Sequence, residues 1–138
     1  MHITLESDYA VRIVYCLARS GQRIDAKKIA EETGVTLRFS LKILRKLVAG
    51  GLVSSYKGTK GGYELGRPPA EISLCDVIET VEGPYALARC VGEGDYHCNR
   101  NTESCGVCKF QRIYAEISDT VRERLSRVRF SDLMDPPN

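Results

Sequence analysis

Four cysteines lie within nineteen residues of the C-terminal half of this chain: Cys90, Cys98, Cys105 and Cys108. Thiolates are soft ligands, and four of them can complete either a zinc site or an iron–sulfur cluster. The spacing, C-x7-C-x6-C-x2-C, does not by itself favour one of these over the other. His97 is a further candidate ligand, although a loop histidine more often has no such role. The four cysteines therefore indicate a metal or iron–sulfur site.

The start of the chain bears on the state of these thiols. The first ten residues, MHITLESDYA, lack the basic start and apolar stretch of a secretory signal peptide. No apolar run approaches the roughly 20 residues that span a bilayer. We therefore expect a cytoplasmic protein without a membrane partner, in which disulfides are rare. Cys16 and Cys75 lie beside apolar neighbours in predicted helices, so we expect them to be buried structural cysteines.

Charge is distributed unevenly along the sequence. Residues 1–67 carry twelve Lys and Arg against six Asp and Glu, whereas residues 68–138 carry eight against twelve. Between positions 38 and 60 there are six bases and no acid: Arg38, Lys42, Arg45, Lys46, Lys57 and Lys60. Such a run is often only a solvated surface. Here it coincides with a predicted helix and hairpin, which favours a phosphate-binding surface.

Local signals predict three helices in the first fifty residues, over 7–20, 26–33 and 37–49. Each follows a polar residue able to cap its N-terminus: Ser7 or Asp8, then Asp25, then Thr36. A tight turn containing Gly34 joins the second helix to the third. The two together form a helix–turn–helix.

The third of these helices has two distinct faces. Apolar residues form the stripe expected to be buried: Phe39, Ile43, Leu44 and Leu47. The opposite face carries Arg38, Leu41, Lys42 and Arg45, three of which are basic. Leu41 is either an isolated surface leucine or a side chain that meets a thymine methyl in a major groove.

A hairpin should follow this helix directly. Two short β-prone runs, 52–56 and 63–65, flank a glycine-rich turn that contains Lys57 and Lys60. A helix–turn–helix followed by such a hairpin is a winged helix. One more helix, 74–82, should be capped by Ser73 and ended by Gly83. The fold class is therefore mainly α with a small β-hairpin wing.

The C-terminal part differs from the winged helix in its pattern. Residues 84–104 have no periodicity, so the cysteines are expected to organise them. A long helix from about Gly106 to Val128 should follow, with seven apolar residues on one face: Phe110, Ile113, Tyr114, Ile117, Val121, Leu125 and Val128. A stripe this long in so small a protein predicts a partner subunit. We expect a DNA-binding domain over 1–83 and a cysteine loop with a dimerisation helix over 84–138.

With the wing and the cysteine segment in place, the chain resembles the Rrf2 family of bacterial winged-helix regulators. The similar segments are LESDYAVRI at 5–13, FSLKILRKLVAGGLVSSYKGTKGGYELGR at 39–67 and LCDVIETVEG at 74–83. A cysteine cluster before a long helix adds to the resemblance. The wing motif KGxxGGYxL, at 57–65, is the most specific of these features.

The resemblance implies a homodimer that is held together by the long helices and binds a near-palindromic DNA operator. It also implies an iron–sulfur cluster, [4Fe–4S] or [2Fe–2S], because the IscR-, NsrR- and RirA-like branches carry one. Those branches hold it with three cysteines and a fourth ligand. In IscR-like proteins that ligand is a histidine at the position of Cys108, and in NsrR-like proteins it is an aspartate of the partner subunit, which Asp8 matches. This chain has a fourth cysteine, so we expect Cys90, Cys98, Cys105 and Cys108 to hold the cluster, with Asp8 as the alternative to Cys108.

The sequence thus predicts a sequence-specific transcriptional repressor that senses iron, redox state or nitric oxide through its cluster. The residues expected to face DNA are Arg38, Ser40, Leu41, Lys42 and Arg45 in the major groove and Lys57 and Lys60 in the wing. Two alternatives stay open. One is a cluster-free regulator that responds to thiol oxidation or a small metabolite, and the other is a zinc-stabilised adaptor that binds protein. No catalytic motif is present, so an enzyme is not expected.

Overall fold

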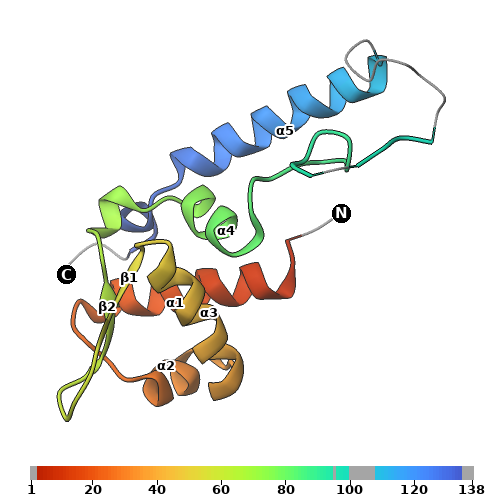
Figure 1. Ribbon diagram of the computed structural model, residues 1–138. Helices are drawn as coiled ribbons and strands as arrows, with labels where there is room; N and C mark the ends of the chain where they lie inside the picture. Colours follow the sequence, from red (N-terminus) through yellow and green to blue (C-terminus); the bar gives the residue numbers. More distant parts are fainter. Residues whose placement is uncertain (1–2, 95, 100–107, 135–138) are drawn as a thin grey trace.

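The computed structural model describes residues 3–94, 96–99 and 108–134. Its elements are α1 (Leu5–Ser20), α2 (Ala26–Thr33), α3 (Leu37–Ala49), β1 (Val53–Tyr56), β2 (Gly62–Leu65), η1 (Pro69–Glu71), α4 (Leu74–Glu82), α5 (Lys109–Arg127) and η3 (Phe130–Leu133). The predicted fold class, a mainly helical winged helix with a long C-terminal helix, is confirmed (Figure 1). Within the described ranges, no helix is both long enough and apolar enough to cross a bilayer.

Helix caps show how local sequence sets these boundaries. Three of the caps are those expected: Asp25, Thr36 and Ser73. The cap of α1 was predicted wrongly, because Thr4 fills this role in place of Ser7 or Asp8. The Thr4 hydroxyl accepts a hydrogen bond from the Ser7 backbone N–H at 3.1 Å. The helix therefore begins earlier, and Ser7 lies buried inside its first turn.

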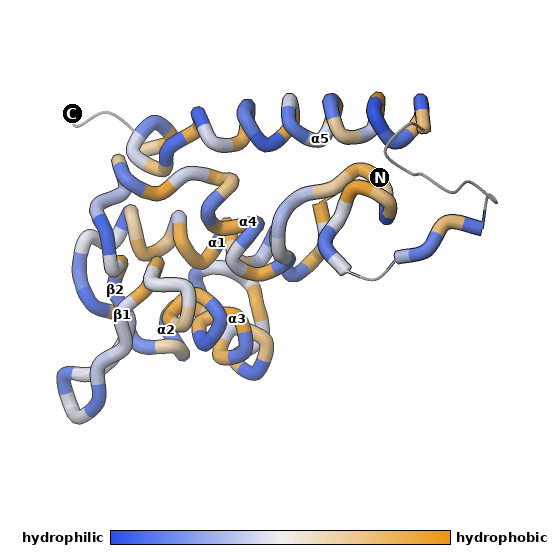
Figure 2. Tube along the Cα trace, turned by 45° about the horizontal axis from the view of Figure 1, so that its top comes forward, coloured by the Kyte–Doolittle hydropathy of each residue, from blue (hydrophilic) through white to orange (hydrophobic). Residues whose placement is uncertain are grey.

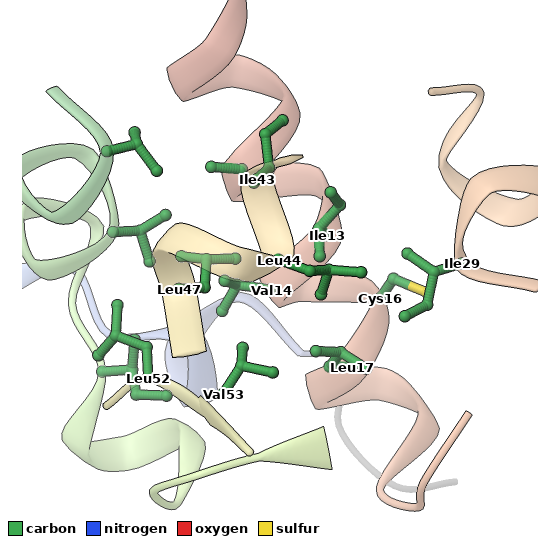
Figure 3. Close-up of a cluster of buried hydrophobic side chains, with 14 of the residues drawn as sticks. Ile13, Val14, Cys16, Leu17, Ile29, Ile43, Leu44, Leu47, Leu52 and Val53 are labelled. Carbon is green, nitrogen blue, oxygen red and sulfur yellow. The ribbon is translucent and has the colours of Figure 1, made fainter. Parts of the chain in front are cut away.

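The core lies between α1, α3, α4 and the hairpin (Figure 3). Its fully buried side chains include Ile13, Val14, Ile43, Leu44, Leu47 and Leu52. Phe130, from η3 near the end of the chain, belongs to the same core and is also completely buried. Its backbone N–H donates to the Ile72 carbonyl at 3.0 Å. The end of the chain thus returns to the winged helix, which no periodic pattern around Phe130 had indicated.

The wing is an antiparallel pair in which Val53 lies opposite Leu65. A single bridge between Ile24 and Tyr63 attaches the pair to the connection between α1 and α2, with N···O distances of 3.0 and 2.8 Å. This close approach explains the glycine at Gly62. A Cβ there would lie 2.5 Å from the Ile24 carbonyl oxygen, and its φ of 142° is unfavourable for other residues. The tip of the wing projects from the body of the protein (Figure 1).

Helix α5 begins at Lys109, while residues 106–107 of its predicted start lie outside the described ranges. Its C-terminal part packs against α4, and its N-terminal part extends beyond the body, above the segment that follows α4 (Figures 1 and 2). Three large apolar side chains of α5 remain substantially exposed: Phe110, Ile113 and Ile117, at 53%, 48% and 42%. Much of the predicted stripe is therefore uncovered in a single chain.

Candidate nucleic-acid interface and cysteine pocket

One face of α3 presents the predicted DNA-contacting side chains to solvent. Arg38, Lys42 and Arg45 are exposed there, together with Leu41. They line a shallow groove of about 710 Å³. Lys46, the remaining base of this helix, forms a 2.7 Å ion pair with Glu6 and is turned away from the groove. The face is therefore cationic with an apolar strip.

Phe39 lines this groove and contacts α1 through its aromatic ring. Its ring makes a T-shaped contact with the Tyr9 ring, with the centroids 5.4 Å apart and the planes at 89°. The Lys42 ammonium lies 5.5 Å from the same ring, within the range of a cation–π contact. Phe39 is half-buried, so its contact with Tyr9 ties this face of α3 to α1.

Ser40 was predicted to face DNA, and this prediction is wrong. Its side chain is completely buried, because it shares a face of α3 with Ile43, Leu44 and Leu47. Its Oγ has no hydrogen-bond partner among the residues that the structure describes. Leu37 was not predicted to belong to the DNA-contacting face of α3. It is 46% exposed and lines the groove, and its spacing of four residues from Leu41 was a signal that could have indicated it.

The wing carries Lys57 and Lys60 as exposed side chains. Arg23, from the connection between α1 and α2, braces it. The Arg23 guanidinium lies 3.4 Å from the centroid of the Tyr56 ring and donates to the Lys60 carbonyl at 3.3 Å. It also forms an ion pair with Glu64 at 3.6 Å. Sequence patterns did not indicate Arg23, since its partners lie more than thirty positions away.

Three of the four clustered cysteines line one pocket. Cys90, Cys98 and Cys108 share a pocket of about 310 Å³ with several aromatic and polar side chains. Cys105 lies outside the described residues. Within the described part of the chain, no three His, Cys, Asp or Glu side chains form a group ready to hold a metal ion. His97 is exposed and does not line the pocket.

Polar contacts attach the segment before Cys90 to α4 and α5. Ser118 is buried in α5, where its Oγ accepts from the Leu87 backbone N–H at 2.9 Å and donates to the Tyr114 carbonyl at 2.7 Å. On α4, a Glu79 oxygen accepts from the Tyr85 backbone N–H at 3.4 Å. The chain is thus fixed twice shortly before it reaches the cysteine pocket.

Glu79 is also the ion-pair partner of Arg122 on α5. The guanidinium donates from Nε and from NH2, the latter at 3.2 Å. Burial raises the pKa of Glu79, but hydrogen bonds from Arg122, Cys75 and the Tyr85 backbone outweigh burial and hold this pKa below its ordinary value. The carboxylate therefore stays ionised and links α4 to α5.

Asp8, the alternative ligand, lies in the first turn of α1 and is about half exposed. It forms a 2.9 Å ion pair with Arg12, one turn further along the helix. Asp8 does not line the cysteine pocket of its own chain. Its part in ligation remains a prediction that requires a second subunit.

The expectation that Cys16 and Cys75 are buried is confirmed, at 8% and 6% exposure. Burial raises the pKa of the Cys16 thiol to about 12, and a hydrogen bond to Glu32 at 3.2 Å adds to the shift. Burial is also the main reason that the pKa of Cys75 is raised. Protonated thiols are poor ligands and nucleophiles, so their burial agrees with the predicted structural role.

Comparison with known proteins agrees with this arrangement. The family model Rrf2, described as an iron-dependent transcriptional regulator, matches residues 3–136. Protein aau3 of Rhizobium meliloti is 38% identical over 108 residues, which cover 78% of this chain and 70% of that protein. The HTH-type transcriptional regulator IscR of Vibrio vulnificus is 29% identical over 136 residues, covering 97% and 77%.

Solved structures show the same fold. CymR, the global cysteine regulator of B. subtilis, has a TM-score of 0.74 at 25% identity and covers 96% of this chain and 95% of its own. T. potens IscR has a TM-score of 0.73 at 22% identity, covering 96% and 85%. The oxidized form of Staphylococcus aureus CymR has a TM-score of 0.73 at 26% identity, covering 100% and 99%. The family model is described as a transcriptional regulator, IscR and CymR are named as regulators rather than enzymes, and the chain belongs to the Rrf2 family of transcriptional regulators.

Proposed function

We propose that this protein is a cytoplasmic, homodimeric repressor that binds a near-palindromic operator and senses through an iron–sulfur cluster. The cationic groove of α3 and the braced, basic wing are the observations that support DNA binding most directly. The helix would enter a major groove with Arg38, Lys42 and Arg45. The wing would bring Lys57 and Lys60 to the DNA sugar–phosphate backbone or to an adjacent minor groove.

The dimer is supported by the apolar face of α5. Phe110, Ile113 and Ile117 each leave over 40% of their surface exposed in a single chain. Beside this helix, a second hollow of about 450 Å³ opens between the N-terminus of α1, α4 and α5, with Val121 and Leu125 in its lining. Burying these apolar side chains against a second copy would be favourable, and twofold symmetry would match the operator's two half-sites.

Four cysteines would hold the cluster: Cys90, Cys98, Cys105 and Cys108. The three described members of this set already line one pocket, which fits a thiolate-ligated group. When bound, a cluster supplies a centre that oxidants, nitric oxide or iron shortage can alter. The family model's description as iron-dependent also supports this proposal.

The contacts around the pocket suggest how such a change could reach DNA. The Ser118 and Glu79 hydrogen bonds fix the chain that leads into Cys90. If the cysteine segment rearranged, these hydrogen bonds would shift α5 and α4. Helix α4 packs against α1 and α3, so the change would reach α3. Two arrangements of this segment would then bind operator with different affinity.

A second candidate is a regulator whose cysteine thiols respond directly to oxidation. The existence of an oxidized form of the similar S. aureus CymR favours it. Cys90 and Cys98 are not in disulfides and could take part.

An anaerobic visible absorption spectrum with iron and sulfide analysis separates the candidates. Broad sulfur-to-iron charge-transfer bands are expected, and alanine at any one of the four clustered cysteines should abolish or severely destabilise them. His97→Ala is the matched control, because His97 neighbours Cys98 but does not line the pocket. A colourless protein without iron favours thiol regulation, and one zinc per chain favours the adaptor. If Cys108→Ala kept its iron while Asp8→Ala lost it, three cysteines and the partner's aspartate would hold the cluster.

DNA binding is tested by selection from a random duplex pool, followed by titration at several salt concentrations. The protein should select a near-palindromic sequence, and its affinity should fall steeply with salt. Arg38→Ala should relax discrimination at one or two base positions. A protein that selects no sequence would overturn the proposed function.

A further inference from the structure

Leu37 and Leu41 form an apolar strip on the outer face of α3. They are 46% and 39% exposed, and a spacing of four residues places them on neighbouring turns of the same helix face. A single exposed leucine needs no explanation. Two in register, both in the groove lined by Arg38, Lys42 and Arg45, form a continuous apolar strip inside a cationic surface.

The chemical groups available on α3 are few. Its sequence, LRFSLKILRKLVA, contains no Asp, Glu, Asn or Gln. Asn and Gln are the side chains that pair with adenine in the major groove, and a carboxylate accepts from the cytosine amino group. Ser40 is buried, and the Thr36 hydroxyl accepts the capping hydrogen bond of Phe39 N–H at 3.2 Å. The exposed groups of α3 can therefore recognise two bases: guanine, through Arg or Lys, and thymine, through aliphatic carbon.

The surrounding charges identify the occupant of this groove. Arg38, Lys42 and Arg45 have no ion pair within the described part of the chain. Cations without acidic partners favour a polyanion over an apolar protein surface. The thymine 5-methyl is the apolar group that B-DNA presents in its major groove, so it matches the leucine strip.

We propose that Leu37 and Leu41 read thymine 5-methyl groups, so that α3 specifies thymine and guanine in each operator half-site. This inference rests on the proposed DNA-binding function and adds the base identity that the helix recognises. The basic side chains supply contacts to guanine and phosphate on either side. The leucines supply contact with the methyl groups and exclude water from them.

The test uses the full-length protein and the operator selected from the random pool. Each thymine is replaced in turn by deoxyuridine, which removes only the methyl group. At one or two positions per half-site, this replacement should lower the protein's affinity for the operator about 4-fold. That factor of about 4 corresponds to the burial of one methylene-sized group. Thymines elsewhere in the site should tolerate the change.

Protein variants then assign each methyl to its leucine. Leu41→Ala should bind thymine and deoxyuridine equally at one position, and Leu37→Ala at another. Leu133→Ala is the matched control, since Leu133 is 43% exposed but lies in η3, outside the groove. A protein that selects an operator but shows no deoxyuridine effect anywhere would overturn this inference and leave the proposed function intact. A protein that selects no sequence would overturn both.

Discussion

Replacing Ser40 and Ser118 by alanine, in separate variants, should change the free energy of unfolding in opposite directions. The two serines match closely, because both lie in α-helices and are 0% and 1% exposed. They differ in their hydrogen bonds. The Ser40 Oγ has no partner among the described residues, whereas the Ser118 Oγ accepts one bond and donates another. Comparing the two variants therefore isolates the effect of hydrogen-bond satisfaction.

Ser40→Ala should stabilise the protein by about 1 kcal/mol. A buried polar group without a partner costs roughly 1–3 kcal/mol, and alanine removes it. Alanine also has the higher helix propensity, by about 0.5 kcal/mol. The small void left by the oxygen offsets part of this gain. For a chain of 138 residues, the melting temperature should rise by roughly 3–5 °C.

Ser118→Ala should destabilise the protein by about 1 kcal/mol. Alanine leaves the Leu87 backbone N–H without its 2.9 Å acceptor, at a cost of roughly 1–3 kcal/mol. The lost bond to the Tyr114 carbonyl matters less, since that carbonyl lies within the backbone ladder of α5. Helix propensity again favours alanine by about 0.5 kcal/mol. Because the propensity gain is the same in both variants, it cancels in the comparison.

Chemical denaturation measures the free energy of unfolding of both variants. The protein concentration is kept the same in each experiment, so that dimerisation contributes equally to both values. Operator affinity supplies a second measurement, and Ser40→Ala should bind DNA as the parent does because its side chain does not reach the surface. If Ser40→Ala lost 1 kcal/mol or more, its hydroxyl would have a stabilising partner. If Ser40→Ala bound operator poorly while remaining folded, the buried hydroxyl would contribute to positioning α3 for DNA binding.

Three further predictions concern α5, the α4–α5 ion pair and the wing. Ile117→Glu should yield folded monomers in sedimentation, because Ile117 is already 42% exposed in one chain. Arg112→Glu, at an exposed position on the far side of the same helix, should remain dimeric. A dimer in both variants would move the interface elsewhere. The pKa of Glu79 is lower in the folded state than its ordinary value of 4.5. Its partly exposed ion pair with Arg122 should therefore stabilise the protein by about 1 kcal/mol above pH 4.5. This stabilisation is lost as the pH falls through the folded-state pKa. Melting curves at pH 7 and pH 4 should therefore differ less for Glu79→Gln than for the parent, and an equal difference would contradict this. Arg23→Ala should weaken operator binding about 10-fold without changing the salt slope, whereas Lys57→Ala should lower the slope by about 1; an equal drop in both slopes would make Arg23 a phosphate contact.

Local signals were sufficient to predict much of the winged helix. Asp25, Thr36 and Ser73 cap the helices that they were expected to cap. These predictions succeeded because a cap is a contact between residues three positions apart. The failure at Thr4 has the same origin. Thr4 and Ser7 are both good caps, and only the burial of Ser7 against the core distinguishes them.

The candidate site was less predictable, because its organisation depends on distant contacts. Ser40 looked like a DNA-contacting residue because it is polar, but its position on the helix places it with the apolar stripe. Helical periodicity, applied without regard to polarity, would have buried it. Arg23 braces the wing through residues more than thirty positions later in the chain, and no local pattern contains that information.

Helix α4 connects the cysteine segment to α3 through two sets of contacts. On one side, Glu79 contacts Arg122 of α5 and the Tyr85 backbone. On the other side, the Lys46 ammonium of α3 donates to the Val81 carbonyl at 3.4 Å, close to its ion pair with Glu6. Lys46 thus belongs to the run of bases that suggested DNA binding but holds α3 against α4 and α1. A basic residue in this run can therefore serve DNA binding by fixing the position of the helix that carries the others.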